Sequence, residues 1–218
     1  MNENEMLSPR EFYDIMAPYY ESFIESTRFS FLSLEAEEKF IVTFIQRPRT
    51  VLDVGCGTGR TMKLLYDGKR ELFGVDISRK MVELAGNQGL KVIQASAYHL
   101  PFPDSCFEAI YSLHGGFGYC QNNLEMEMLL LELSRVLQRG GIMLMDTPHG
   151  KVRGEQYITS WSAGDITINM TSYGKTEENI KEALSKTGFG QMRFFGGYDE
   201  AVSLQDDSRR IIVVSTKT

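Results

Sequence analysis

The chain has 218 residues, of which 42% are hydrophobic, and a formal net charge of −6 at pH 7. This length and apolar content suit one globular domain with a full core. The acidic balance argues against a nucleic-acid surface, which needs a clustered basic stripe, and no stretch approaches the roughly 18 apolar residues that span a membrane.

The first section, residues 1–47, is predicted to hold two helices. Ser8-Pro9-Arg10-Glu11 forms a capping box with proline at the first helical position. Apolar residues then recur at helical spacing: Phe12, Ile15, Met16, Tyr19 and Phe23. A second helix is expected over about residues 33–46.

The N-terminus and the cysteines bear on where the protein acts. The segment "MNENEMLSPREF" is polar and acidic, so it resembles neither a signal peptide nor a transit peptide. The three cysteines form no C-x-x-C pair, which suits reduced thiols. With three dispersed histidines beside them, we expect no metal site and a cytoplasmic protein.

The second section, residues 48–147, alternates strands with helices. Strands are predicted at "TVLDV", "ELFGVDI", "KVIQA", "FEAIYSL" and "IMLMDT". Helices follow at "GRTMKLLYD", at "SRKMVELAGNQG" with Ser78 as N-cap, and from Asn122 or Asn123 to about Gln138. In that last helix, Leu124, Met128, Leu131 and Val136 are expected to share a buried face, and Gly140-Gly141 to end it. Such alternation is typical of βαβ crossovers in a parallel sheet.

The third section, residues 148–218, has a different pattern. Residues 148–165 carry no clear period and are expected to form a loop with a short irregular element. "DITINMTSYG" can form a strand, and Thr176 begins a helix. The segments "GQMRFFGGY" and "RRIIVVST" are joined by a polar turn too short for a crossover helix, so they should form a hairpin. The predicted fold is a single doubly wound α/β domain, with a Rossmann-like seven-stranded sheet whose last strand is antiparallel.

One turn in this fold is unusually rich in glycine. "VLDVGCGTGR" at residues 51–60 places Gly55, Gly57 and Gly59 at alternate positions after a strand, which differs from the G-x-G-x-x-G of dinucleotide sites. Asp53 precedes the turn and would attract an ammonium group. Asp76 ends the next strand, where a carboxylate can accept both hydroxyls of a ribose. A nucleoside that carries an amino acid meets both requirements, and S-adenosylmethionine is such a molecule.

Several segments together resemble class I S-adenosylmethionine-dependent methyltransferases of the small-molecule type. "VLDVGCGTGR" is similar to the first motif of that family, and "GVDIS" to its ribose-binding acidic end. "QASAYHLPFPDSCFEAIYS" resembles the segment that lines the adenine, and "LSRVLQRGGIMLMDT" the helix-turn-strand that follows. "FYDIMAPYY" resembles an N-terminal lid that folds over the cofactor.

The resemblance implies S-adenosyl-L-methionine as cofactor and a set of residues that bind it. These are Tyr20, Asp53, Gly55, Gly57, Gly59, Asp76, Ile77, Met81, Ser96, Ala97 and Leu113. The family often has an aspartate where this chain has Ser96. Since a hydroxyl carries no charge, we expect adenine binding to depend more on backbone groups and on apolar contacts, including one from Leu100.

The acceptor is less closely defined by the sequence. His114 follows the fourth strand and is the candidate general base; the alternative is a loop or substrate-contact residue. The segment "LHGGFGYC" lacks the Pro-Pro-aromatic run of nucleic-acid amino-methyltransferases, which favours a small molecule. A protein or RNA acceptor, or cofactor binding without transfer, are the alternatives. Aromatic residues expected to line the pocket or to pack are Tyr13, Tyr19, Tyr20, Tyr119 and Trp161.

Overall fold

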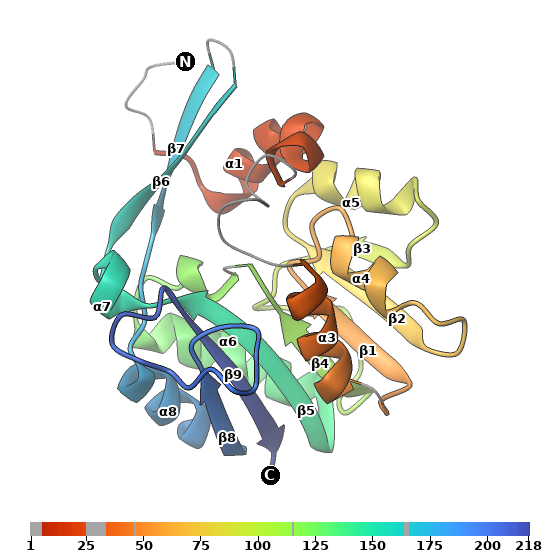
Figure 1. Cartoon of the computed structure of the whole chain (residues 1–218). Coiled ribbons are helices and arrows are strands. Elements are labelled where there is room, and N and C mark those ends of the chain that lie inside the picture. Colours follow the sequence, from red (N-terminus) through yellow and green to blue (C-terminus); the bar gives the residue numbers. More distant parts are fainter. Residues whose placement is uncertain (1–5, 25–33, 46, 115, 164–165) are drawn as a thin grey trace.

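A central seven-stranded sheet organises the molecule (Figure 1). The computed structural model describes residues 6–24, 34–45, 47–114, 116–163 and 166–218. The strand order is β3-β2-β1-β4-β5-β9-β8. The strands are β1 (Thr50–Val54), β2 (Glu71–Asp76), β3 (Val92–Gln94), β4 (Phe107–Ser112), β5 (Leu137–Pro148), β8 (Phe189–Phe195) and β9 (Arg210–Lys217).

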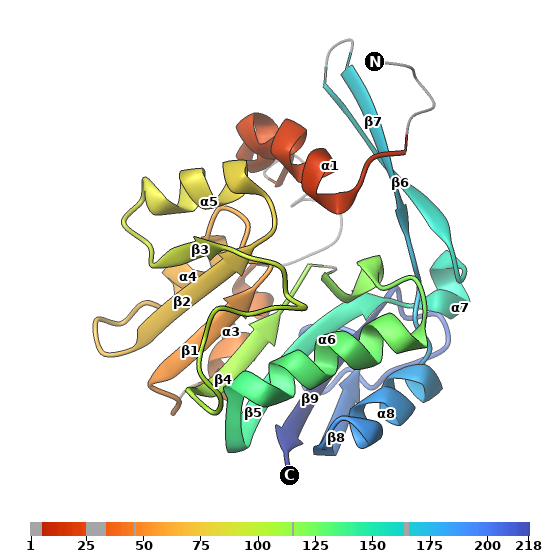
Figure 2. The same ribbon diagram turned by 180° about the vertical axis from the view of Figure 1, so that it is seen from behind.

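Helices cover both faces of this sheet. The helical elements are α1 (Pro9–Met16), η1 (Ala17–Tyr19), α3 (Leu34–Ile45), α4 (Arg60–Leu65), α5 (Arg79–Gly86), η2 (Gly116–Tyr119), α6 (Asn123–Val136), α7 (Gly150–Arg153) and α8 (Glu177–Lys186). Helices α3 and α4 lie on the face toward the viewer in Figure 1, and α6 and α8 on the face seen in Figure 2. Two buried apolar clusters fill the two sides of the sheet. No helix among the described residues is long and apolar enough to cross a membrane.

The predicted sheet is confirmed in its strand directions. Strand β1 pairs in parallel with β2 and β4, and β5 pairs in parallel with β4. Strand β9 is antiparallel to both β5 and β8, as expected for the C-terminal hairpin. Because the chain runs outward from β1 in both directions, the strand order reverses between β1 and β4. In open α/β sheets ligands bind at the carboxyl ends of the strands on either side of such a reversal.

The segment expected to be an irregular loop forms a strand instead. Residues Tyr157–Ala163 form β6, which pairs antiparallel with β7 (Ile166–Ser172) outside the main sheet. The pair extends above the sheet beside α1 (Figure 1). Strand β6 alternates exposed residues with more buried ones, including Trp161, but its serines and threonines concealed the period in the sequence.

The long helix α6 buries a different face from the predicted one. Leu124, Met128 and Leu131 are 66%, 49% and 54% exposed, so that expectation was wrong for these three residues, whereas Val136 is buried as expected. The core-facing positions are Met126, Leu129, Leu130, Leu133 and Val136. Two apolar stripes at helical spacing occur in this helix, and periodicity alone does not say which one meets the sheet. Strand β5 also begins directly after α6, so Gly140 and Gly141 lie within β5.

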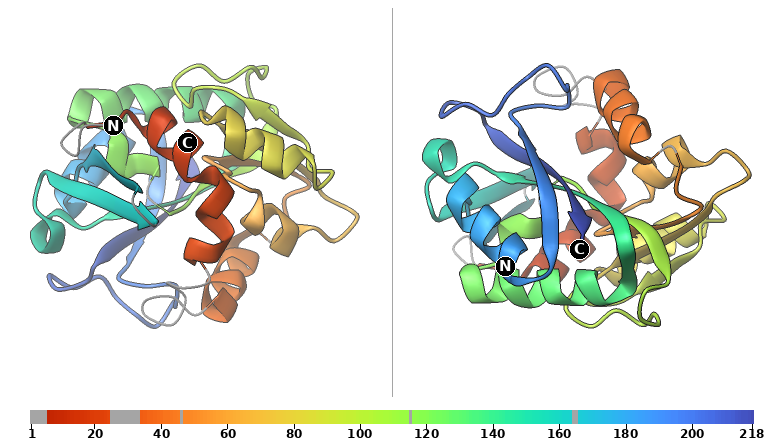
Figure 3. Two further views of the ribbon diagram at one scale, coloured as in Figure 1. Left: turned by 90° about the horizontal axis from the view of Figure 1, so that it is seen from above. Right: turned by 90° about the horizontal axis from the view of Figure 1, so that it is seen from below.

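The N-terminal helices lie over the carboxyl ends of the strands. Helix α1 begins with the predicted capping box, in which Ser8 and Glu11 exchange hydrogen bonds. Seen from above (Figure 3, left), this segment crosses the top of the molecule between α5 and the β6–β7 hairpin. Residues 33 and 46, the expected ends of the second helix, lie outside the described residues, and α3 spans Leu34–Ile45 between them.

Candidate active site

A cavity of about 570 Å³ lies at the carboxyl ends of β1, β2 and β4. It brings together ten of the predicted cofactor-binding and catalytic residues. These are Tyr20, Gly55, Gly57, Asp76, Ile77, Met81, Ser96, Ala97, Leu113 and His114. Asp53 and Gly59 do not line it, and Leu100 is buried in the core beside it. The volume is in the range of pockets that enclose a small molecule or cofactor.

The three glycines of the turn serve two different purposes. All three have positive φ, at 80°, 53° and 80° for Gly55, Gly57 and Gly59. A Cβ atom on Gly55 or Gly57 would meet nothing within 4 Å, so the main chain there lies open to the cavity. A Cβ atom on Gly59 would lie 2.1 Å from Leu90 Cδ1. Gly59 is the N-cap of α4, and its missing side chain allows this helix to pack.

This difference predicts separate effects for two matched substitutions. Gly57→Ala and Gly59→Ala both place a side chain at positive φ, which costs about 1–2 kcal/mol. Gly59→Ala also forces Leu90 to move, so we expect it to destabilise the fold by about 1–3 kcal/mol more. Urea unfolding of the two variants measures the difference. Equal loss of stability in both would show that Leu90 turns away without cost.

Asp76 is held at the cavity wall by main-chain amides from two loops. Its two carboxylate oxygens accept hydrogen bonds from Gly57 N and from Ser78 N, each at 2.8 Å. Burial raises the pKa of Asp76, and these amides oppose that rise. The amides therefore connect the acidic end of β2 to the glycine turn and fix the direction of the carboxylate.

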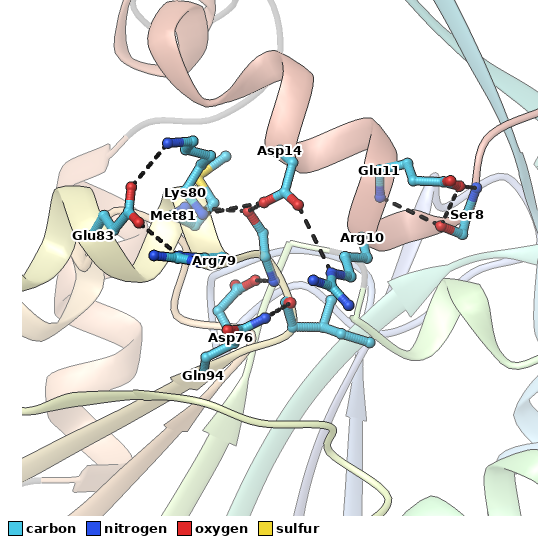
Figure 4. Close-up of polar contacts among 12 residues, drawn as sticks. Ser8, Arg10, Glu11, Asp14, Asp76, Arg79, Lys80, Met81, Glu83 and Gln94 are labelled. Carbon is cyan, nitrogen blue, oxygen red and sulfur yellow. Dashed lines mark hydrogen bonds and ion pairs between the residues drawn. The ribbon is translucent and has the colours of Figure 1, made fainter.

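Helix α1 contacts the same loop through Asp14. Its Oδ1 accepts from Ser78 Oγ at 2.6 Å and from Lys80 N at 3.1 Å, at the N-terminus of α5. Figure 4 shows Asp14 reaching from α1 toward the start of α5, with Asp76 below it. A carboxylate at a helix N-terminus is stabilised by the unpaired amides and the helix dipole. Ser78 thus links the N-terminal helix to Asp76, because its hydroxyl donates to Asp14 and its main-chain amide donates to Asp76.

Asp53 lies beside a second, much smaller cavity of about 30 Å³. Tyr20, Gly55 and Arg60 also line this space. Burial raises the pKa of Asp53 to about 8, and the neighbouring Tyr111 hydroxyl opposes the rise. At neutral pH most of this carboxyl is therefore protonated, and a cation placed beside it would favour its ionised form.

Tyrosines from separate segments form the upper wall of the large cavity. The hydroxyls of Tyr13 and Tyr119 lie 2.5 Å apart, and the Tyr13 ring meets the Tyr20 and Tyr119 rings edge-on. Tyr19 and Trp161 lie outside the cavity and pack against each other instead, with ring centroids 5.3 Å apart. Three of the five proposed aromatic residues thus line the cavity.

His114 lies where both cavities meet, directly after β4. Its φ of 63° is unusual for a residue other than glycine, so its neighbours must hold it in place. The imidazole Nε2 lies 2.7 Å from Glu37 Oε1 and 2.6 Å from Arg60 Nη2. Arg60 Nη2 in turn donates to both carboxylate oxygens of Glu37, at 3.1 and 3.4 Å. Polar side chains from two helices, α3 and α4, therefore contact the imidazole.

The residues of the two cavities fit S-adenosylmethionine. The buried carboxylate of Asp76 can accept hydroxyl donors, and the turn at Gly55 and Gly57 leaves room for a ligand against the main chain. Residues 52–145 match the family described as Methyltransferase domain. The chain is also 31% identical over 216 residues to the uncharacterized protein MJ1252 of Methanocaldococcus jannaschii, a match that covers 89% of this chain and 81% of that protein.

The chain belongs to the class I S-adenosylmethionine-dependent methyltransferases. It is also 33% identical over 123 residues to a probable tRNA methyltransferase 9B of Mus musculus, a match that covers 54% of this chain and only 27% of that protein. Among solved structures, an S-adenosylmethionine-dependent methyltransferase from Clostridium acetobutylicum superposes with a TM-score of 0.78 at 16% identity, over 91% of this chain and 98% of that one. This methyltransferase therefore uses S-adenosylmethionine as its cofactor.

Three residues of the methyltransferase site could not be recognised from the sequence. Glu37 falls within the expected second helix, and the structure shows its side chain fully buried against His114. Arg60 ends the glycine-rich segment, but its contacts with Glu37 and His114 arise only in the fold. Glu37 lies in the charged segment "LEAEEK" beside Glu38, so it gives only a weak signal, and its partners Arg60 and His114 lie far along the chain. Asp14 on α1 gives no local signal either, because its partners Ser78 and Lys80 lie 64 and 66 residues further along the chain.

Proposed function

We propose that this methyltransferase transfers a methyl group to a nitrogen or oxygen atom of a small molecule. The observation that carries the proposal is the large cavity, which extends from the glycine turn to His114 under Tyr13, Tyr20 and Tyr119. A pocket roofed in this way suits a ligand that can be enclosed, since enzyme pockets bury most of a small ligand's surface.

The residues of the turn and the strand ends are proposed to bind the cofactor. Asp76 would accept the two ribose hydroxyls, and the main chain at Gly55 and Gly57 would lie against the ligand. The apolar residues Ile77, Met81, Ala97 and Leu113 would contact the adenine, and Ser96 would supply one neutral hydrogen bond.

The small cavity is proposed to hold the amino-acid end of the cofactor. Asp53 would pair with the ammonium group. Arg60 Nη1 is buried and has no hydrogen-bond partner within the described part of the chain, so it can donate to a carboxylate. Opposite charges on the two sides of one small space suit a zwitterion.

The chain's contribution to the reaction is proposed to be alignment and proton removal. The cofactor supplies a methyl group on a sulfonium, which is an excellent leaving group. The enclosed cavity would hold the acceptor in line with this group and exclude water, and positioning of this kind accounts for much of the rate in such displacements. His114 would accept the acceptor's proton.

An RNA acceptor is the second candidate, because the mouse relative is named as a probable tRNA methyltransferase. This chain spans about a quarter of that relative's length, and its net charge is −6. A polyanionic acceptor would require basic side chains around the cavity mouth. Among the described residues, those that line the large cavity include two histidines and two acidic groups but no arginine or lysine, which favours the small molecule.

Incubation with cofactor labelled in its methyl group would test the proposed acceptor. One set of reactions would contain phenols, amines and hydroxy acids, and a parallel set would contain unmodified tRNA. We expect label in one of the small molecules, with at least tenfold less transfer in a His114→Asn variant that binds S-adenosylhomocysteine normally. Label found in tRNA alone would replace the proposal with the second candidate.

A further inference from the structure

Glu37 is a buried carboxylate that lines neither cavity, yet it contacts the candidate base. Its side chain is 0% exposed, whereas that of His114 is 26% exposed. The contact between Oε1 and Nε2, at 2.7 Å, joins α3 to the end of β4 across 77 residues of sequence. No step of the proposed reaction uses Glu37 directly, so its position requires a separate explanation.

The charge of Glu37 determines what the contact can be. Burial alone would raise the pKa of this carboxyl, but hydrogen bonds and positive charge from His114 and Arg60 outweigh burial and hold the pKa below its usual value. An ionised carboxylate has no proton to donate and can only accept. A hydrogen bond to it therefore requires a proton on Nε2 of the imidazole.

We propose that Glu37 is a positioning residue that fixes His114 as its Nε2–H tautomer and leaves the Nδ1 lone pair to accept a proton. In the neutral imidazole one ring nitrogen donates and the other accepts, so a proton fixed on Nε2 makes Nδ1 basic. No hydrogen bond to Nδ1 is found among the described residues. This inference rests on the proposed role of His114 as general base.

The proposed step balances in protons and electrons. A lone pair on the acceptor's oxygen or nitrogen forms the new bond to the methyl carbon. The carbon–sulfur bond breaks, and its electron pair stays on sulfur as a neutral thioether. The acceptor's proton moves to Nδ1 of His114, and Glu37 stabilises the resulting imidazolium through Nε2–H without itself taking a proton.

Arg60 offers the competing arrangement. Its Nη2 lies 2.6 Å from Nε2, and an arginine always donates. If that contact were the hydrogen bond, Nε2 would accept, the proton would lie on Nδ1, and the imidazole could not act as a base through that atom. The two arrangements place the ring proton on different nitrogens, which makes them distinguishable by spectroscopy.

The test is the ¹⁵N NMR spectrum of the full chain labelled at histidine. The protein has only three histidines, and a His114→Asn variant identifies the signals of His114. For the neutral ring we expect the Nε2–H pattern in the wild-type protein. Glu37→Met removes the acceptor and should shift the ring to Nδ1–H, whereas Glu37→Gln keeps an acceptor oxygen and should retain Nε2–H. A wild-type ring protonated on Nδ1 would overturn the inference.

Kinetics supply the second measurement. We expect Glu37→Met to lower kcat by about 10- to 100-fold with the affinity for S-adenosylhomocysteine unchanged, and Glu37→Gln to recover part of the loss. Glu38→Met changes the exposed neighbour on the same helix and should leave kcat unaltered. If Glu37→Met does not fold, the tautomer of His114 measured in the wild type and in Glu37→Gln still tests the inference. If the NMR spectra show the expected tautomers but His114→Asn keeps full kcat, His114 is not the general base of the proposed function. The inference that Glu37 fixes the tautomer of His114 then still stands.

Discussion

Replacing Asp76 with alanine is expected to weaken the binding of S-adenosylhomocysteine by about 2–3 kcal/mol, which is roughly a 30- to 150-fold rise in Kd. A carboxylate that accepts two ribose hydroxyls makes charge-assisted hydrogen bonds, and these are about twice as strong as neutral ones. Asp76 also accepts from Gly57 N and Ser78 N, so the substitution releases both loops that form the site.

Ser96→Ala provides the matched comparison, since it removes one neutral acceptor from the cavity wall just after β3, the strand that pairs with β2. Ser96 Oγ already accepts from Tyr98 N at 3.3 Å, so we expect a smaller loss of about 0.5–1.5 kcal/mol. Calorimetric titration of both variants gives the order, and their circular dichroism spectra check that each is folded. If Ser96→Ala costs more than Asp76→Ala, the ribose is not the group that anchors the cofactor.

The parts of this site that could be predicted from the sequence are those encoded locally. Gly55 and Gly57 follow β1 and Asp76 is the last residue of β2. Because the carboxyl ends of parallel strands meet at one edge of the sheet, the pattern of strands predicts where these residues lie. The same reasoning placed Ser96 and His114 near them. To predict the position of each of these residues, it was enough to predict the strand that leads to it and the point where that strand ends.

The parts that could not be predicted depend on contacts between distant segments. Glu37 and His114 belong to different elements, and nothing in either local sequence indicates that they meet. Strand β6 could not be recognised because its exposed side includes the apolar Ile158 and its more buried side the polar Thr159, so apolar and polar residues do not alternate. Its pairing with β7 lies outside the main sheet. For α6, two apolar stripes competed, and the neighbouring elements decided which one is buried.

The second large effect concerns the N-terminal segment. Deleting residues 1–24 is expected to leave a folded protein that binds the cofactor weakly and turns over little. Tyr13 and Tyr20 would be lost from the cavity wall, and the opened site would admit water. The main sheet does not include this segment. The deletion is expected to lower the stability of the fold, because it exposes the apolar face of the β6–β7 hairpin, where Trp161 and Met170 pack with Phe12 and Met16.

Whether this segment moves as a lid or is a permanently fixed helix depends on the strength of its two attachments. One is apolar, to the hairpin, where Leu7 N also donates to Asn169 O at 2.8 Å. The other is polar, from Asp14 to Ser78 and Lys80 at the start of α5. The polar attachment is the one linked to Asp76, so a ribose bound there would steady the loop that Asp14 holds. A lid would therefore be mobile without cofactor and become ordered with it, sealing the site as gating segments do.

Hydrogen exchange over residues 10–25, with and without S-adenosylhomocysteine, separates a lid from a fixed helix. For a lid, we expect strong protection only in the presence of the ligand, and Asp14→Ala should weaken that protection because the link to α5 is gone. The exposed ion pair of Arg10 with Asp14 contributes little to stability, so Arg10→Ala is the control that leaves the exchange pattern unchanged. Equal protection with and without ligand would mean that the segment is fixed. Tyr13 and Tyr20 would then be static parts of the cavity wall, and an acceptor could not enter the cavity past them.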